Sequence, residues 1–227
     1  MSDEKILSVK SCTVKKSDIA TLSPHTYLND LIIMFYYEMI EGKYPSKDIT
    51  LLEPAVSMSI ILNANDGNDL EDIKECIFLP LEFDKKKFIF APINDNTTIQ
   101  YTCSGTHWTL IVVDVDNNLL YYLDSIKGNV SNAHTFHDRI EKLFGKKFEF
   151  IHALKKQYQT NSYDCGMFLL GFTEVLIKYL NTYGMKLNNE KSLDYIFKGE
   201  NLVDQKYMGT FRNNIKNLIY KMAENKK

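Results

Sequence analysis

A series of short apolar runs followed by one long run constrains the fold of this chain more than any other feature. From residue 88 onward, four short runs rich in β-branched and aromatic residues alternate with polar segments, as expected for strands. They are FIFAPI, WTLIVVDV, LLYYLD and KFEFI. The apolar stretch that follows, from Met167 to Leu180, is too long for a typical strand and predicts a buried helix that begins at or near Cys165. Asn29 to Ile40 predicts an earlier buried helix, and Lys206 to Met222 a final amphipathic one. The pattern therefore predicts an α+β domain, with an antiparallel-rich sheet between early and late helices.

The length and composition suit one packed domain. At 227 residues the chain is long enough to bury most of the surface that its unfolded form exposes. Hydrophobic residues make up 44% and aromatic residues 12%, which is typical of a globular protein and not of a disordered one. The polar stretch from Asn63 to Glu71 predicts a loop within the domain. We therefore expect one domain over residues 1–227, with about 15 N-terminal residues as an extended arm.

Charge balance and hydropathy narrow the classes of partner. A net charge of only −2 provides no basic surface of the kind that neutralises phosphates, so no nucleic-acid partner is expected. The first residues, MSDEKILSV, lack the apolar run of a signal peptide, and no later stretch reaches the length of a membrane span. We expect an intracellular monomer, cytoplasmic or nuclear, without a membrane partner. Secretion as an effector into a host cell is the alternative location.

The four cysteines are scattered without CxxC spacing, which argues against a disulfide framework and a structural zinc site. Cys103 and His107 lie four residues apart, but no second Cys/His pair accompanies them, so no metal is expected. Cys165 differs because the helix predicted to begin there offers free backbone N–H groups and a dipole that favour a thiolate. A buried helix cysteine is ordinarily an inert small hydrophobe, so its position alone favours the inert reading.

Two polar residues beside a predicted hairpin are suited to serve such a thiolate. His107 lies where a polar loop enters the second strand, and Asp124 ends the third. With a two-residue turn at Asn117-Asn118, Asp124 lies opposite Ile111. Ile111 shares a face with His107, because side chains alternate along a strand. That register leaves His107 and Asp124 roughly 13 Å apart, too far for a hydrogen bond, whereas a shift of two residues keeps the face and shortens the distance. We expect both side chains on one side of the sheet, with the register open.

Three segments resemble the signature segments of a known family. GTHWTLIVVD, LDS and QTNSYDCGMF resemble, in chain order, the Ulp/SENP family of ubiquitin-like-protein-specific cysteine proteases. Within that family the sequence is most similar to the deneddylases, on the segments TYLNDLIIMFYYE and FAPINDN. The matching segments together cover roughly residues 21–180. The resemblance implies a papain-like cysteine protease architecture of the adenain/Ulp type, with a central antiparallel-rich sheet flanked by helices.

The resemblance also implies a role for each residue of the set. Cys165 would be the nucleophile, His107 the general base and then the acid, and Asp124 the carboxylate that orients the imidazole. Gln159, six residues before Cys165, would donate to the oxyanion beside the Cys165 backbone N–H. Without the motif, a glutamine in the polar KKQYQTNS loop would ordinarily be a surface residue. This chemistry needs no cofactor.

A narrow channel for a Gly-Gly tail is a further implication of the resemblance. Trp108, the only tryptophan, would help to roof a passage too tight for side chains, although the same ring also suits a core anchor of the strand. The family usually has tryptophan at the other roof position, where this chain has Tyr27. Asp30 resembles the acid that meets an arginine in the modifier's tail, and as a helix-start residue it would need no function.

The leading hypothesis is a protease that hydrolyses the peptide or isopeptide bond after the C-terminal Gly-Gly of a ubiquitin-like modifier. A Nedd-type modifier and its conjugates are the first expectation for the partner, SUMO the second and ubiquitin the third. Two other hypotheses are an effector-type acetyltransferase on the same scaffold and an inactive module that binds the modifier. The channel residues favour the protease over the acetyltransferase, and the complete set of catalytic-type residues argues against inactivity.

Overall fold

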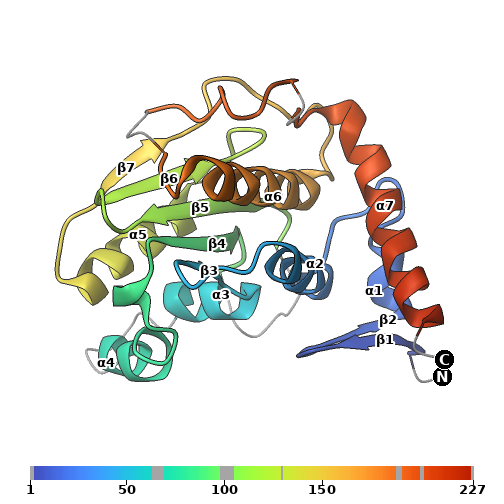
Figure 1. The fold of residues 1–227 in the computed structure, drawn as a ribbon, viewed down its shortest axis with the longest axis horizontal. Helices are drawn as coiled ribbons and strands as arrows, with labels where there is room; N and C mark the ends of the chain where they lie inside the picture. Colours follow the sequence, from blue (N-terminus) through green and yellow to red (C-terminus); the bar gives the residue numbers. More distant parts are fainter. Residues whose placement is uncertain are drawn as a thin grey trace.

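A mixed five-stranded sheet forms the centre of the computed structural model (Figure 1). The structure describes residues 3–62, 69–97, 105–128, 130–187, 191–199 and 202–225. In sheet order, the strands are β3 (Ile49–Leu51), β4 (Phe88–Asn94), β5 (Trp108–Asp114), β6 (Leu119–Leu123) and β7 (Glu149–His152). The two middle pairs, β4 with β5 and β5 with β6, are antiparallel, and β3 and β7 join the edges in parallel. The predicted α+β fold is confirmed, and its sheet is mixed, with two antiparallel and two parallel pairings.

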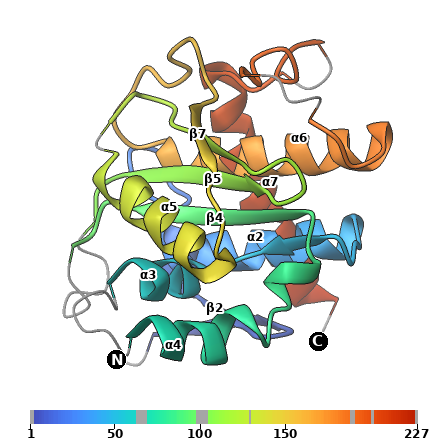
Figure 2. The ribbon, with the colours of Figure 1, turned by 90° about the vertical axis from the view of Figure 1, so that its left-hand side faces the viewer.

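Helices cover both faces of this sheet, so the three middle strands are buried along their whole length. Helices α2 (Asp30–Lys43) and α6 (Cys165–Tyr183) pack on one face, and α3 (Pro54–Leu62) and α5 (Ser131–Phe144) on the other (Figures 1 and 2). Successive side chains of β5 alternate between the two cores, because a strand points neighbouring side chains to opposite faces. Helices flank the sheet as expected, although only those on one face, α2 and α6, were predicted from the sequence.

The predicted helices begin close to where the sequence indicates. Helix α2 starts at Asp30, and the Asn29 side chain accepts a hydrogen bond from the Ile32 N–H, as an N-cap does. Helix α6 starts at Cys165 and ends at a left-handed Gly184, with φ of 82°. The final helix, α7, spans Gln205–Glu224. None of the described helices is both long enough and apolar enough to cross a membrane.

Several shorter elements were not predicted from the sequence. The N-terminal residues form a hairpin in place of an extended arm, because Leu7 and Val14 are buried in the core beneath α2 and α7. Residues 63–68 of the expected loop lie outside the described residues, and α4 begins at Asp69, so the loop prediction was wrong for residues 69–71. The unpredicted elements are β1 (Lys5–Val9), β2 (Cys12–Lys15), α1 (Lys16–Ala20), β3, α3, α4 (Asp69–Ile73), η1 (Lys74–Phe78), η2 (Phe83–Lys85) and α5.

The β5–β6 connection decides where the end of β6 lies. Asp114 pairs with Leu119, so four residues separate the strands instead of two. The Asp114 carboxylate accepts hydrogen bonds from the backbone and side-chain N–H groups of Asn117, which stabilises this longer turn. Leu123 pairs with Leu110, which brings the next residue, Asp124, two positions closer to His107 than a two-residue turn would.

Candidate active site

His107 and Asp124 lie in direct contact at the end of the β5–β6 pair. The His107 Nε2 is 2.8 Å from the Asp124 Oδ1, and both side chains are buried. The Asp124 Oδ2 accepts hydrogen bonds from the Tyr122 hydroxyl at 3.2 Å and from the Gly128 N–H, and Oδ1 accepts one from the Ile126 N–H. A carboxylate held by this many donors has one orientation, and it fixes the plane of the imidazole.

The pair also changes the protonation of the imidazole. Burial disfavours the charged ring, but hydrogen bonds to Asp124 and Cys165 and the negative charge on both partners raise the pKa of His107 to about 10. Burial likewise acts to raise the pKa of Asp124, but the His107 contact and the backbone N–H groups of Ile126 and Gly128 outweigh it and lower that pKa. His107 therefore holds its proton at neutral pH.

Cys165 is the first residue of α6 and lies against His107. Its side chain hydrogen-bonds to the imidazole and, since Nε2 faces Asp124, the ring nitrogen left for the thiol is Nδ1. Cys165 is 1% exposed, so very little of its surface is open to a reactant. The structure thus brings together the three residues that the sequence selects, in the order carboxylate, imidazole and thiol.

Gln159 is held in the same region by both ends of its amide. Its Oε1 accepts from the Ser125 hydroxyl at 2.7 Å, and its Nε2 donates to the Asn161 carbonyl at 2.7 Å. The Ser125 carbonyl also accepts from the backbone N–H groups of Tyr158 and Gln159. Gln159 is fully buried and is not the surface residue that its polar loop would ordinarily give. These contacts tie the loop before Cys165 to the residue after Asp124.

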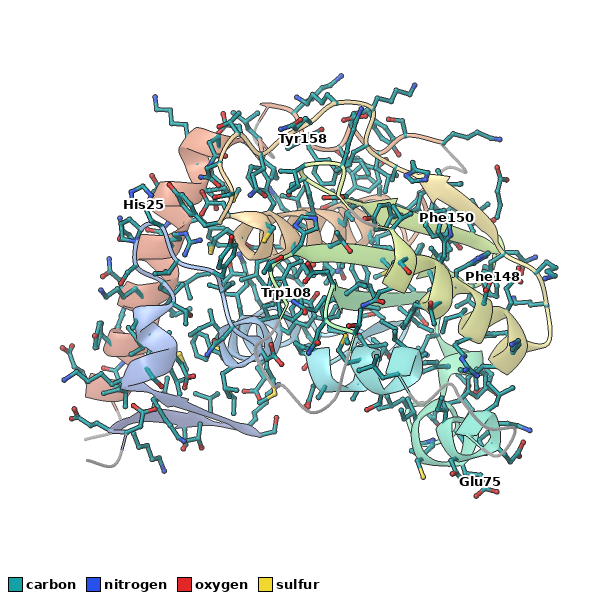
Figure 3. The ribbon with its side chains drawn as sticks, turned by 180° about the vertical axis from the view of Figure 1, so that it is seen from behind. His25, Glu75, Trp108, Phe148, Phe150 and Tyr158 are labelled. Carbon is teal, nitrogen blue, oxygen red and sulfur yellow. The ribbon has the colours of Figure 1, made fainter. Side chains whose placement is uncertain are left out.

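The three predicted substrate-binding residues line one cavity. Tyr27, Asp30 and Trp108 border a space of about 660 Å³, whose far wall is the face of α3 that carries Met58 and Leu62. Tyr27 is 45% exposed, whereas Trp108 is 5% exposed and occupies the middle of the molecule (Figure 3). The Trp108 indole N–H donates to the Leu28 carbonyl at 3.0 Å. Both interpretations of the tryptophan therefore apply, since it anchors the core and borders the cavity.

The comparison with known families agrees with this geometry. The model of the Ulp1 protease family, C-terminal catalytic domain, matches residues 26–226. The chain belongs to the Ulp1 protease family. This membership confirms the resemblance found from the sequence and makes the protein a cysteine protease.

Two curated relatives of the Ulp1 family illustrate the degree of likeness. NEDD8-specific protease 1 of Arabidopsis thaliana is 29% identical over 190 residues, which cover 83% of this chain and 82% of the relative. Sentrin-specific protease 8 of Homo sapiens is 30% identical over 181 residues, which cover 77% of this chain and 82% of the relative.

Two solved structures share the fold of this chain. The C-terminal Ulp1 protease domain in complex with the yeast ortholog of SUMO is 21% identical, with a TM-score of 0.67, and the match covers 98% of this chain and 90% of that chain. The Xanthomonas campestris effector XopD bound to ubiquitin is 17% identical, with a TM-score of 0.58, and the match covers 86% of this chain and 96% of that chain.

The close approach of α6 to the Leu28 segment leads to a first prediction, at Gly166. A Cβ on Gly166 would lie 2.7 Å from the Leu28 Cβ and 3.3 Å from the Trp108 Cδ1. We expect Gly166→Ala to lower the free energy of unfolding by about 1–3 kcal/mol through overpacking, measured by denaturant unfolding. Gly171→Ala, on the same helix, is the control, since its Cβ would meet nothing closer than 3.4 Å and alanine favours a helix. Equal stability of the two variants would contradict the close packing.

Several residues that support this Ulp1-family site were not predicted from the sequence. Tyr122 and Ser125 contact Asp124 and Gln159, and a side chain at Gly128 would come within 3.0 Å of the His107 ring. The position of Tyr122, two residues before Asp124 on the same face of a strand, was the available signal. Cys103, the other half of the spacing considered for zinc, lies outside the described residues.

Proposed function

We propose that this Ulp1-family protease hydrolyses the bond after the C-terminal Gly-Gly of a ubiquitin-like modifier, with Cys165 as nucleophile. The single observation that carries the proposal is the contact series from Asp124 through His107 to Cys165, buried at the start of a helix. An orienting carboxylate, an imidazole and a thiol in this order are the parts that acyl transfer by a cysteine requires.

The reaction assigns one task to each part. The Cys165 thiolate attacks the carbonyl carbon of the terminal glycine, and the charge that develops on the carbonyl oxygen is met by the Cys165 N–H and the Gln159 amide. The imidazolium of His107 then gives its proton to the leaving amine, and a thioester remains on Cys165. Water attacks the thioester, His107 takes one proton from it, and the modifier leaves with a free carboxylate.

The close packing between the cavity at Trp108 and the start of α6 supports a thin tail as the substrate. With Leu28 against Gly166 and the Trp108 indole bonded to the Leu28 carbonyl, the backbones on the two sides of the approach lie close together. Glycine has no side chain to clash in such an approach. Asp30, at the exposed start of α2, offers a carboxylate to a basic residue farther along the tail.

The preferred modifier is proposed to be of the NEDD8 type, because relatives named as NEDD8-specific proteases match about four fifths of this chain. We expect kcat/KM to be highest for NEDD8 in a panel of NEDD8, SUMO and ubiquitin, each carrying a C-terminal fluorophore. Release of the fluorophore measures the rate. Fastest turnover of SUMO or ubiquitin would overturn the preference and leave the protease intact.

The same panel separates the protease from the two alternatives. An acetyltransferase or an inactive binding module would release no fluorophore from any of the three modifiers. NEDD8 with a C-terminal electrophile is expected to form a covalent adduct on Cys165, which mass spectrometry of the peptides locates. An adduct on another residue, or none, would contradict the proposed nucleophile.

A further inference from the structure

One buried guanidinium joins three segments that are far apart in the sequence. Arg212 lies on α7, 4% exposed, and its five N–H groups make five hydrogen bonds. The Nε donates to the Asp164 carboxylate at 2.7 Å, and the remaining donors reach four backbone carbonyls. These carbonyls belong to Thr21, Ser23, Thr26 and Tyr163.

Three of these carbonyls lie on the loop that leads into the substrate cavity. This loop, residues 21–26, carries His25 in the left-handed region with φ of 63°, and Figure 3 shows His25 beside α7. A non-glycine residue in that region needs its neighbours to hold it. The hydrogen bonds from Arg212 fix this loop, and of the next residues Tyr27 and Leu28 line the cavity, while Leu28 also packs against Gly166, the residue after Cys165.

The other two acceptors, the Tyr163 carbonyl and the Asp164 carboxylate, directly precede Cys165 in the chain. Asp164 is the residue before Cys165, at the N-cap of α6, and its carboxylate is turned to Arg212 instead of capping the helix. The second carboxylate oxygen accepts from the Asn161 amide and the Gln205 amide, both at 2.6 Å. Asn161 also accepts from Gln159. The start of α6 and the loop of the proposed oxyanion donor are therefore tied to α7.

Packing alone does not explain a charge at this position. The neighbours of Arg212 on the buried face of α7 are apolar, namely Met208, Phe211 and Ile215. Burial of an ion pair is costly unless its hydrogen bonds are satisfied, and apolar residues in place of the whole Arg212–Asp164 pair would often be as stable. The planar guanidinium differs in that it reaches acceptors on two segments at fixed angles at once.

We propose that Arg212 is a positioning residue, which sets the distance between Cys165 and the loop 21–28 that borders the substrate approach. The proposal rests on the proposed protease function. A shift of about 1 Å between nucleophile and bound carbonyl costs about a hundredfold in rate. Such a shift should lower the rate of cleavage of a modifier substrate, because the modifier must contact both segments. It should not change the rate at which a small reagent alkylates the thiol, because the His107–Asp124 pair is untouched.

The test compares Arg212→Lys and Arg212→Met with the wild-type chain at a temperature where thermal melts show each to be folded. We expect kcat/KM for the fluorogenic modifier to fall about tenfold to a hundredfold, mainly in kcat. Alkylation of Cys165 by iodoacetamide should keep its wild-type rate. Arg139→Met is the matched control, since it changes the only other arginine of the chain, on α5, and should leave both rates unchanged.

The outcomes separate this proposal from the one it rests on. If the wild-type chain cleaves none of the modifiers, the proposed protease function itself is overturned. With an active wild type, folded Arg212 variants whose kcat and KM stay within about twofold of it would overturn the positioning role. An equal fall in alkylation would do the same, because the defect would then lie in the thiol. If the methionine variant fails to fold, the lysine variant, which keeps the charge, carries the same comparison.

Discussion

Cys165→Ala is expected to lower kcat by about 10⁴-fold or more, because no other group can form the thioester. The fold should persist, since the change removes a single sulfur from the first turn of a helix whose packing rests on larger side chains. The variant should also keep its affinity for the modifier, because the cavity beside Trp108 is unchanged. Fluorophore release measures the first effect, and a titration with uncleaved modifier measures the second.

Cys12→Ala is the matched control for that variant. Cys12 is as buried as Cys165, but burial and the nearby charges of Glu38 and Asp18 raise the pKa of its thiol to about 11, so it is inert at neutral pH. Its removal should leave kcat/KM unchanged and cost about 1 kcal/mol of stability. Turnover by Cys165→Ala at the wild-type rate would remove Cys165 from the mechanism.

The sequence predicted the elements that carry the site because each has a strong local pattern. The β-branched runs of β4, β5 and β6 are buried along their whole length and the apolar run after Cys165 is buried through Thr173, so composition and run length identify them directly. The start of α6 at Cys165 followed from the same run. Membership of the Ulp1 family was likewise visible, since its motifs lie on these elements.

The contacts between elements could not be predicted from the sequence. The His107–Asp124 distance depended on the turn, and the polar run DVDNN fits a two-residue or a four-residue turn until the Asp114–Asn117 hydrogen bonds select the longer one. Helix α5, which carries the chain from β6 to the parallel strand β7, was missed for a different reason: its buried residues Ala133, Phe136, Ile140 and Leu143 recur at helical spacing, so the signal was present in the sequence. Arg212 lay on a helix that was predicted, but its partners are up to 191 residues away.

The raised pKa of His107 has a consequence for stability that the sequence could not give. The folded pKa of about 10 exceeds the ordinary histidine pKa of 6.5, so the contacts of the imidazolium stabilise the fold fully below about pH 6.5. This contribution is lost as the pH rises through about 10. For Asp124, whose pKa is lowered, the contribution is present above the ordinary aspartate pKa of 3.8 and is lost as the pH falls through the lower pKa of the folded state.

Asp124→Asn is expected to lower kcat by about 10³-fold to 10⁴-fold, because the amide neither carries the charge nor fixes the tautomer that His107 needs. It should also move the pH dependence in a definite direction. In the wild-type chain the carboxylate and the thiol keep the imidazole protonated up to about pH 10, so kcat/KM should fall only above that pH.

Without the Asp124 charge, the pKa of His107 falls and the alkaline limb of the profile moves toward neutral pH. The direction is fixed, since loss of a negative partner can only disfavour the imidazolium. The measurement is kcat/KM from about pH 5 to about pH 11 for the wild-type chain and for Asp124→Asn, and it compares the alkaline limbs of the two profiles. Asp116→Asn, an exposed change in the turn at the other end of the hairpin, is the control and should leave the profile in place. An alkaline limb that stays near pH 10 in Asp124→Asn would mean that Asp124 does not raise the pKa of His107. The contact with the thiol would then account for the raised pKa alone.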